Sequence, residues 1–284
     1  MKAAIVDAWG AIPAYTDALD QVRDDALVVD VEASALTNLT RGLVSGTHYA
    51  SREIQLPAVP GVDGVVRLQD GRRVYNGALA AHGMMAERTL ISPHGMYELP
   101  AEVDSVTAAA VPNPGISAWT SLEHAAAVTA GDSVLVLGAT GVTGATAVQL
   151  AKSVFGAGRV VVGRDAARLD WLGTVGADEA ITLSSHPSAH YHRTRFVQVG
   201  SMVGPNMNLA AGILRSTGIV MTGVGLGSVP PEVLARVHAE ALPRLFDMVA
   251  NGALELRTRA RPLAEIADAW TASEPSGTRV VLTP

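Results

Sequence analysis

Cysteine is absent from the chain, and charge and long apolar runs are scarce. Without cysteine there are no disulfides, thiolate nucleophiles or zinc sites built on sulfur. Charged residues make up 17% of the 284 residues, and the 21 basic ones are scattered, so we expect no nucleic-acid surface. No apolar stretch reaches the length of a membrane span, so we expect no membrane partner.

The start of the chain shows no charged and apolar leader of the secretory kind, because Met1 runs directly into the strand-like stretch KAAIV. This predicts a cytoplasmic protein. Hydrophobic residues make up 48% of the chain, which indicates a globular protein. The length exceeds that of a typical single core, which favours two domains.

Two patterns divide the chain. Residues 1–112 alternate short β-like runs with Gly, Pro and Asp, which is typical of a small, mostly antiparallel barrel. Residues 113–245 alternate helix and strand patterns, which predicts a parallel sheet flanked by helices. Residues 246–284 contain a helix and a strand that the second pattern does not need, and we assign them to the first domain. The fold class is α/β.

The stretch SVLVLGATGVTGATAVQLAK, residues 133–152, carries the strongest functional signal. An apolar strand ends at Gly138 and a helix opens near Val142. Glycines at this spacing let the backbone turn tightly, approach a diphosphate and pack the helix on the strand, while free N–H groups face the anion. The context predicts a dinucleotide site, against the alternative of a turn kept only for packing. The residues predicted to contact the cofactor are Ala139, Thr140, Gly141 and Val142.

The second strand of this pattern, RVVVG, ends at Gly163 and is followed by Arg164. An NAD site usually places an acidic residue there, whereas an arginine pairs well with a 2′-phosphate. This favours NADP, with Arg168 one turn further as support. Two alternatives stay open: Arg164 is a solvated surface residue, or Asp165 caps the helix or binds the ribose.

The chain resembles the medium-chain dehydrogenase/reductase superfamily, and within it the zinc-free quinone oxidoreductase and enoyl reductase branch. The resemblance covers nearly the whole chain and implies a GroES-like barrel and a Rossmann domain with NADPH in the cleft between them. The segments that carry it are SALTNLTRGLVSGTHY (34–49), LPAVPGVDGVVRL (56–68), GMMAERTLI (83–91), VPNPGISAW (111–119), LGATGVTG (137–144), FVQVGS (196–201) and GVGLGS (223–228).

The resemblance also implies residues of a substrate cleft. Tyr49 matches a tyrosine that serves as proton donor or polar anchor, with the alternative that it only forms a wall of the cleft. A second tyrosine of some relatives falls on Gly42, so the pocket is wider or built differently. Zinc ligands are missing, and Asp63 alone is no metal site. The simplest role of Asp63 is to cap backbone N–H groups of a turn, although we also count it among the predicted cleft residues. The predicted cleft residues are Tyr49, Asn38, Asn113 and Asp63.

The last segments of the resemblance imply contacts to the nicotinamide half of the cofactor, at Val199, Gly200, Ser201, Gly225 and Leu226. They also imply a homodimer, because relatives join two subunits through the strand that matches residues 218–225, which is apolar and at an edge here.

One unit of the Rossmann pattern is missing. Only eleven residues, Ser184 to Thr194, separate the strand-like ITL from RFVQVG. Extended, they span roughly 36 Å, enough for a bare crossing but not for the usual strand and helix of about thirty residues. We therefore expect RFVQVG to lie beside the first strand in a five-stranded sheet, or to be extended by the segment before it. Three histidines in the gap, His186, His190 and His192, are interpreted as polar cover rather than as a metal site.

Three functions remain open at this point. The resemblance favours an NADPH-dependent reductase of quinones or conjugated enones. The missing unit leaves room for a non-redox cyclase, isomerase or lyase that acts on an enone-like intermediate. A binding or scaffold protein is the third alternative. No G-x-S-x-G motif is present, which argues against a hydrolase.

Overall fold

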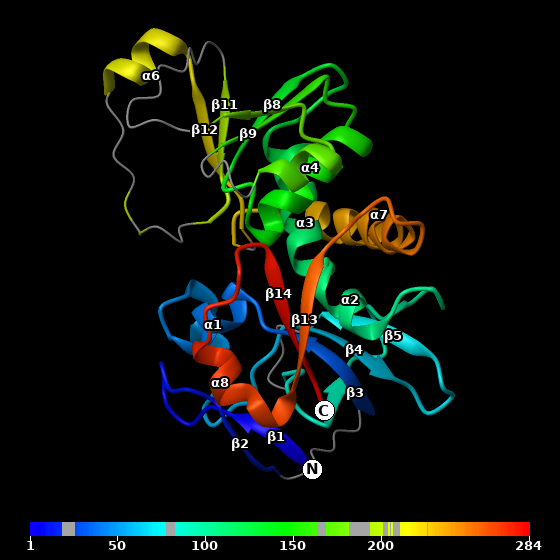
Figure 1. The fold of residues 1–284 in the computed structure, drawn as a ribbon. Helices are drawn as coiled ribbons and strands as arrows, with labels where there is room; N and C mark the ends of the chain where they lie inside the picture. The colour runs from blue at the N-terminus through cyan, green and yellow to red at the C-terminus, as the bar shows by residue number, and fades with distance from the viewer. Residues whose placement is uncertain are drawn as a thin grey trace. The chain divides into compact units, whose positions relative to one another are not determined.

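The structure, a computed structural model, describes residues 1–18, 26–77, 83–163, 169–181, 194–200, 204, 206, 211–225 and 227–284. These residues form two compact units (Figure 1). Unit 1 comprises Met1–Asn113 and Leu242–Pro284, and unit 2 comprises Pro114–Ala241. Among the described residues, no helix is long and apolar enough to cross a membrane.

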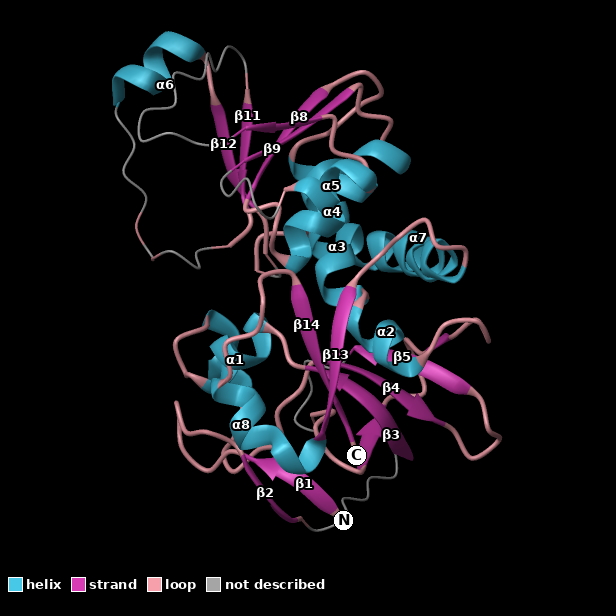
Figure 2. Ribbon diagram, viewed as in Figure 1, coloured by secondary structure: helices cyan, strands magenta, loops and turns pink. Residues whose placement is uncertain are grey.

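Unit 1 is built on a seven-stranded, largely antiparallel sheet in the order β13-β14-β3-β4-β5-β7, with β6 also paired to β3 (Figure 2). The C-terminal segment joins this sheet directly, since β14 pairs with β3 through Val281 and Ala35. A separate antiparallel ladder joins β1 to β2. The bounds are β1 Lys2–Ile5, β2 Ala14–Asp17, β3 Leu27–Ala35, β4 Asp63–Arg67, β5 Arg73–Gly77, β6 Arg88–Ile91, β7 Tyr97–Glu98, β13 Arg257–Pro262 and β14 Thr278–Thr283.

Two apolar clusters among the described residues contribute to the core of unit 1. One lies among the central strands and contains Val31, Val66 and Met84. The other lies between the N-terminal strand and the C-terminal segment and contains Leu263 and Ile266. In β3 the apolar residues alternate with polar ones and point to one buried face, whereas β4 and β5 are buried along most of their length. Burial of such side chains is the main favourable contribution to folding.

Side chains cap three of the short helices of unit 1, namely α1, η1 and α2. Thr37 Oγ1 accepts the Thr40 N–H at 3.0 Å before α1, and an Asp104 carboxylate oxygen accepts the Thr107 N–H at 2.9 Å before α2. Such caps satisfy backbone donors that the first turn leaves unpaired. The helices are α1 Asn38–Val44, η1 Tyr49–Glu53, α2 Ser105–Ala110, η4 Leu263–Glu265 and α8 Ile266–Thr271.

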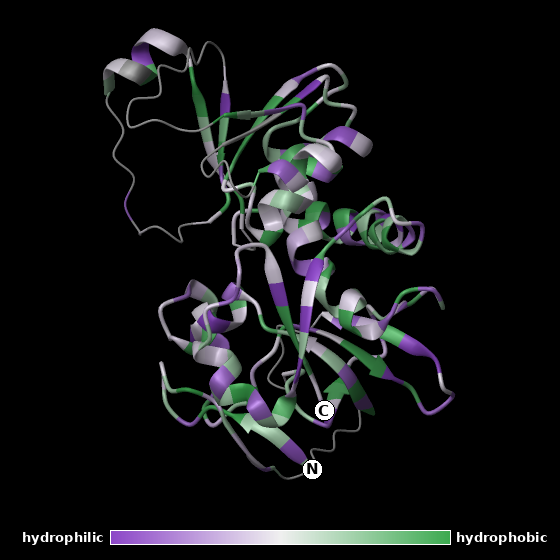
Figure 3. Cartoon of the chain, in the orientation of Figure 1, coloured by the Kyte–Doolittle hydropathy of each residue, from purple (hydrophilic) through white to green (hydrophobic). Residues whose placement is uncertain are grey.

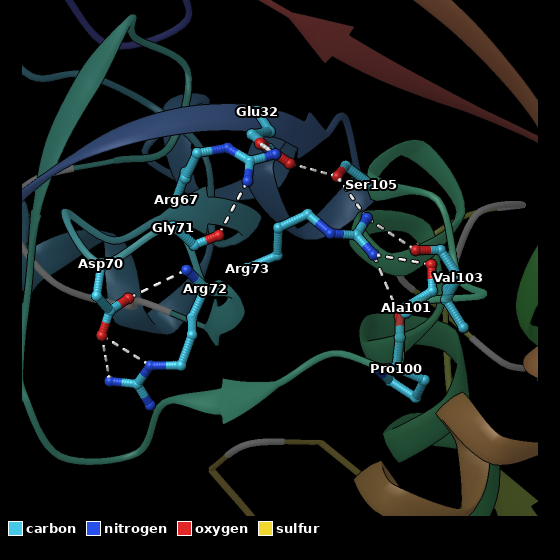
Figure 4. Close-up of polar contacts among 10 residues, drawn as sticks. All are labelled: Glu32, Arg67, Asp70, Gly71, Arg72, Arg73, Pro100, Ala101, Val103 and Ser105. Atoms are coloured by element: carbon cyan, nitrogen blue, oxygen red, sulfur yellow. Dashed lines mark hydrogen bonds and ion pairs between the residues drawn. The ribbon is translucent and has the colours of Figure 1, made fainter.

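Arg73 on β5 forms hydrogen bonds with the segment that leads into α2 (Figure 4). Its guanidinium donates to the carbonyl oxygens of Val103 at 2.9 Å and of Pro100 and Ala101 at 3.2 Å each. It also donates to Ser105 Oγ, which in turn donates to Glu32. The planar guanidinium thereby satisfies several carbonyls of an irregular segment at once.

Unit 2 contains two parallel ladders. One has the order β10-β9-β8, and the other joins β11 to β12. The bounds are β8 Ser133–Leu137, α4 Val142–Ser153, β9 Arg159–Gly163, α5 Asp170–Thr174, β10 Glu179–Ile181, β11 Arg195–Gln198, α6 Ala211–Thr217 and β12 Val220–Gly223. Helix α3, Pro112–Thr120, contains the first boundary between the units and continues as the π-helix η2, Ser121–Ala125. Helix α7, Pro231–Ala250, contains the second boundary.

The five strands predicted for unit 2 are present, but they do not form the expected single ladder. Among the described residues, β11 pairs only with β12, and β8 pairs only with β9. The expectation that β11 pairs beside β8 is therefore wrong for this part of the chain. The histidines of the gap, His186, His190 and His192, and the rest of residues 182–193 lie outside the described residues.

Several helix limits differ from the sequence patterns. The helix-like stretch SAWTSLEHAAAV begins at Ser117, whereas α3 begins at Pro112, because proline suits the first turn of a helix. α7, Pro231–Ala250, includes Pro243 within the helix. Strand β8 also differs, because Leu135 and Leu137 are 44% and 53% exposed although its hydropathy is that of a buried strand (Figure 3). The units change at Asn113/Pro114 and at Ala241/Leu242.

Candidate functional site

The turn between β8 and α4 has the geometry of an anion site. Gly138 adopts φ +73°, a conformation that side chains rarely tolerate, and its carbonyl accepts the Gly141 N–H at 3.0 Å. Gly141 is the N-cap of α4 and contributes no side-chain cap. The first-turn amides of α4 therefore point, without a capping side chain, to where an anion would bind.

Gly144 brings α4 into close contact with this turn. A β-carbon at Gly144 would lie 2.3 Å from the carbonyl oxygen of Gly138 and 2.7 Å from Cα of Ala139. Only glycine fits such an approach. Ala139 is fully buried, so it offers its backbone rather than its side chain, whereas Thr140, Gly141 and Val142 are half-buried. The residues present thus fit a diphosphate.

The end of β9 lies beside this turn, because Gly163 is in register with Leu137 of β8 and with Ile181 of β10. The carboxyl ends of these parallel strands therefore meet at one edge, where open α/β sheets bind their ligands. Arg164 and Arg168, as well as Asp165, lie outside the described residues. The preference for a 2′-phosphate accordingly stays a prediction from the sequence.

A second edge is formed by the ends of β11 and β12. Gln198 is in register with Gly223, and the Val224 N–H donates to the Gln198 carbonyl at 2.9 Å. This brings together Val199 and Gly200 on one strand end and Gly225 on the other. Ser228 closes the turn, since its Oγ accepts the Gly225 N–H at 3.0 Å. Ser201 and Leu226, the other two predicted contacts here, lie outside the described residues.

Tyr49 opens η1 in unit 1, and its side chain is 55% exposed. Its ring lies 4.1 Å from that of His48, centroid to centroid, at an interplanar angle of 33°. His48 Nδ1 accepts the Ala50 N–H at 3.2 Å, so the proton of the neutral imidazole resides on Nε2. Burial lowers the pKa of His48, which favours this neutral form at pH 7. The pair presents a phenol and an imidazole N–H.

The other predicted cleft residues are placed differently. Asn38 is the exposed first residue of α1, and Asn113 is half-buried in the first turn of α3. Asp63 is only 6% exposed, opens strand β4, and accepts the Tyr75 hydroxyl at 2.6 Å. The structure thus puts Asp63 inside unit 1 rather than in a turn or on a surface that meets substrate. The reason is that β4 runs between β3 and β5, and its first four residues are buried.

Burial shifts the pKa values of two buried charged side chains in this region, Asp63 and Arg279. It raises the pKa of Asp63 to about 6, although the Tyr75 hydrogen bond and the nearby charge of Arg279 oppose the rise. The pKa of Arg279 is likewise lowered, to about 10, mainly by burial; the nearby charge of Asp63 opposes this shift and that of Arg41 adds to it. Arg279 donates to the Leu36 carbonyl at 3.1 Å. Asp63 is therefore a structural carboxyl group held by a tyrosine.

Sequence patterns alone missed His48 and Tyr75. His48 stands beside Tyr49 in the quoted segment, so its position next to a candidate acid was a usable signal. Tyr75 lies in strand β5, and the pairing of that strand with β4, which the sequence leaves open, was needed to connect it with Asp63. Within the described ranges, no group of three or more His, Asp or Glu side chains could hold a metal ion.

Comparison with known proteins gives two kinds of likeness. No protein-family model matches the chain. The human quinone oxidoreductase is 32% identical over 178 residues, which cover 59% of this chain and 49% of that protein. The 2-methylene-furan-3-one reductase of Solanum lycopersicum is 33% identical over 181 residues, which cover 58% of this chain and 46% of the relative. The chain spans about half the length of these curated relatives.

A solved structure matches over the whole chain. The quinone oxidoreductase of Thermus thermophilus, studied with its NADPH complex, has a TM-score of 0.81 and 23% identity, and the match covers 100% of both chains. The fold of this chain is therefore that of the quinone oxidoreductase of Thermus thermophilus. Within that fold, the chain is related in sequence to the quinone oxidoreductases.

Proposed function

We propose that this chain is an NADPH-dependent reductase of quinones or conjugated enones. The observation that carries the proposal is the turn from Gly138 to Gly144, where an uncapped helix start and a glycine-only contact leave room for a diphosphate. The names of the relatives, a quinone oxidoreductase and a furanone reductase, support the acceptor class.

In this proposal the backbone amides after Gly141 bind the diphosphate, and Arg164 with Arg168 binds the 2′-phosphate. Val199, Gly200 and Gly225, together with Ser201 and Leu226, border the nicotinamide. NADPH, when bound, supplies the hydride. In this proposal the site does not need the strand and helix that the Rossmann pattern usually places between β10 and β11 and that this chain lacks.

Tyr49 is proposed as the proton donor. Its phenol is accessible, and the neutral imidazole of His48 lies beside it. The imidazole can form hydrogen bonds at this site without placing a positive charge beside the phenol. An enone needs a proton as it is reduced, whereas a quinone needs little acid assistance. Asn38 and Asn113 are proposed to orient the acceptor. We propose no metal in this site.

Titration of the full chain with NADPH and with NADH by calorimetry, followed by the loss of reduced-nicotinamide absorbance with a panel of quinones and enones, tests the proposal. We expect tighter binding of NADPH and turnover of at least one acceptor class. Tight NADPH binding without turnover of any acceptor would contradict the reductase function. The absence of binding heat with either coenzyme would also contradict the proposed nucleotide site.

A non-redox cyclase, isomerase or lyase is the second candidate. The observation that favours it is the short connection from Ile181, where β10 ends, to Arg195, where β11 begins. A shortened sheet could keep the adenosine half of the site while losing the geometry for hydride transfer. Conversion of an enone-like substrate without any coenzyme would support this candidate over the reductase.

We further propose that the chain forms a homodimer through residues 218–225. Val220 on β12 is 59% exposed, and among the described strands β12 pairs only with β11, so an apolar edge faces outward. A second copy that continues the sheet would cover it. The cytoplasmic location expected from the sequence stays a prediction.

A further inference from the structure

Strand β14 places a charged side chain, Arg279, inside unit 1, where only 8% of the residue is exposed. Its Nη1 donates to the Leu36 carbonyl oxygen at 3.1 Å, and its Nε is buried without a hydrogen-bond partner within the described part of the chain. The nearby charge of Asp63 favours the charged guanidinium, whereas that of Arg41 disfavours it. The guanidinium is therefore buried with incomplete pairing.

Burial of such a group costs free energy of folding. A guanidinium that leaves water loses more than a single hydrogen bond returns, unless all of its donors are paired. An apolar side chain of similar volume would fill the same space without this cost. Packing alone therefore does not explain an arginine at this position. Departures of this kind from the rules of stable cores are expected at functional sites.

The contact made by Arg279 fixes the start of helix α1. Leu36 follows the last residue of β3, and its N–H donates to the Val280 carbonyl at 3.0 Å. Strand β14 therefore bonds both backbone groups of Leu36, one through its main chain and the other through the guanidinium. The next residue, Thr37, is the N-cap of α1, and Asn38 is its first residue. The position of Asn38 thus depends on that of Leu36.

Further hydrogen bonds connect α1 with η1 and with the C-terminal segment. Ser51 of η1 is buried, and its Oγ donates to the Leu43 carbonyl of α1 at 2.8 Å. Tyr49 begins η1, so its backbone is connected to α1 through this bond. Arg41 of α1 donates to the Ala269 carbonyl of α8 at 3.3 Å. A displacement of α1 is therefore expected to displace Tyr49 as well.

We propose that Arg279 is a positioning residue, which holds α1 and η1 through the Leu36 carbonyl and so places Asn38 and Tyr49 for the acceptor. This role rests on the proposed reductase function, in which Asn38 orients the acceptor and Tyr49 donates the proton. Arg279 acts through the backbone and does not touch the acceptor. Small misplacements of reacting groups lower rates steeply, so the loss of Arg279 should appear in kcat.

Kinetics of a charge-free variant test this role. Replacement of Arg279 alone would leave Asp63 without its nearby cation, so the test variant is Asp63→Asn/Arg279→Met and its reference is Asp63→Asn. Uncharged replacements of buried charged groups are often neutral or stabilising, so we expect the double variant to fold, which thermal unfolding checks. Its kcat for an enone should be about tenfold lower than that of the reference, and its kcat for a quinone less than about threefold lower.

The KM for NADPH should be the same in the double variant and in its reference, because the cofactor turn lies in unit 2 and the replaced residues lie in unit 1. A variant with general loss of structure would instead change kcat for both acceptors and KM for NADPH together. An enone-to-quinone ratio of kcat that is equal in the two proteins would overturn the positioning role.

Two further variants distinguish positioning from packing. Arg279→Lys keeps a positive charge and one donor for the Leu36 carbonyl, and it should keep kcat for the enone within about threefold of the wild type. Arg261→Met is the matched control, because Arg261 also has a buried Nε without a partner among the described residues but donates to Glu274 rather than to α1. It should leave the enone-to-quinone ratio unchanged. An equal change of this ratio in Arg261→Met would contradict a specific role of Arg279.

Coupling with Tyr49 tests the route by which Arg279 acts. In a protein that already carries Tyr49→Phe, the double variant should lower kcat for the enone by less than about twofold relative to Asp63→Asn, because both changes affect the same proton donor. Additive losses would show that Arg279 does not act through Tyr49.

Hydrogen exchange of α1 separates this inference from the function on which it rests. The amides of Arg41 and Ser45 bond within the helix region, to the carbonyls of Thr37 and Arg41. We expect both amides to exchange at least about threefold faster in the double variant than in Asp63→Asn. If they do, but the wild type reduces no acceptor, the reductase proposal fails and the hold of Arg279 on α1 survives. If the wild type reduces an enone while exchange and the enone-to-quinone ratio stay unchanged in the double variant, the positioning role fails and the reductase proposal survives.

Discussion

Burial and one hydrogen bond decide the ionisation of Asp63. Its carboxyl group lies inside the sheet, accepts the Tyr75 hydroxyl at 2.6 Å and has a pKa of about 6. The folded protein therefore binds this proton more tightly than the unfolded chain, in which the value is 3.8. The resulting stabilisation is complete below the unfolded pKa and is lost as pH rises through the folded pKa.

We expect Asp63→Asn to gain stability relative to the wild type as pH rises from about 4 to about 7. The difference between 3.8 and about 6 corresponds to about 3 kcal/mol at 1.36 kcal/mol per pKa unit. An asparagine of similar shape can still accept the Tyr75 hydroxyl. Urea unfolding of both proteins across this pH range measures the change. Parallel stability curves would mean that Asp63 does not titrate in this window.

Tyr49 offers a test of acid assistance by a single side chain. We expect Tyr49→Phe to lower kcat for an enone about a hundredfold and kcat for a quinone by less than about threefold, because only the enone needs a positioned proton donor. The measurement is NADPH consumption with one acceptor of each kind. An equal loss with both acceptors would indicate that the phenol only forms a wall of the cleft.

The neighbours Arg72 and Arg73 show how the elements of unit 1 are joined. Arg73 donates to three backbone carbonyls before α2 (Figure 4). Arg72 instead pairs with the exposed carboxylates of Asp70 and Glu98. We expect Arg73→Met to cost about 1–3 kcal/mol of unfolding free energy, since it leaves carbonyls unsatisfied. Arg72→Met should cost less than about 1 kcal/mol, because surface ion pairs contribute little. Chemical denaturation of both variants compares them, and equal costs would contradict this difference.

The contact between α4 and the turn after β8 predicts a specific glycine requirement. Gly144→Ala should displace α4, lower stability by about 1–3 kcal/mol and weaken NADPH binding, because its β-carbon would meet the Gly138 carbonyl at 2.3 Å. Gly173→Ala in α5 is the control, since nothing lies within 4 Å of its β-carbon. That change should be neutral or stabilising. Thermal unfolding and NADPH calorimetry measure both, and unchanged NADPH affinity in Gly144→Ala would contradict the proposed site.

For the molecule as a whole, the exposed edge of β12 predicts self-association. We expect the mass of a dimer by light scattering at micromolar concentration, and a monomer for Val220→Lys, because a lysine on an edge strand opposes pairing. Leu214→Lys, at an exposed apolar position on α6, is the control and should remain dimeric. A monomeric wild type would refute the dimer.

Local patterns predicted much of each unit. The strands near residues 2, 27, 63, 73 and 88 follow short β-like runs bounded by Gly, Pro and Asp, and the β8–α4 turn follows its glycines, because both are local features of the sequence. The strands β2 and β7 were missed, since β2 has four exposed residues without a buried apolar face and β7 has only two residues. The pairing of β11 also escaped prediction, because a connection of this length permits several partners.

Residue types and short spacings were enough to predict the α/β class, the glycine turn that suits a diphosphate and the absence of sulfur ligands. The three-dimensional fold was needed to learn that Asp63 is buried against Tyr75 and that Arg279 donates to the Leu36 carbonyl before α1. Burial and such hydrogen bonds arise from strand pairing between segments far apart in the chain, and no local pattern encodes such pairing.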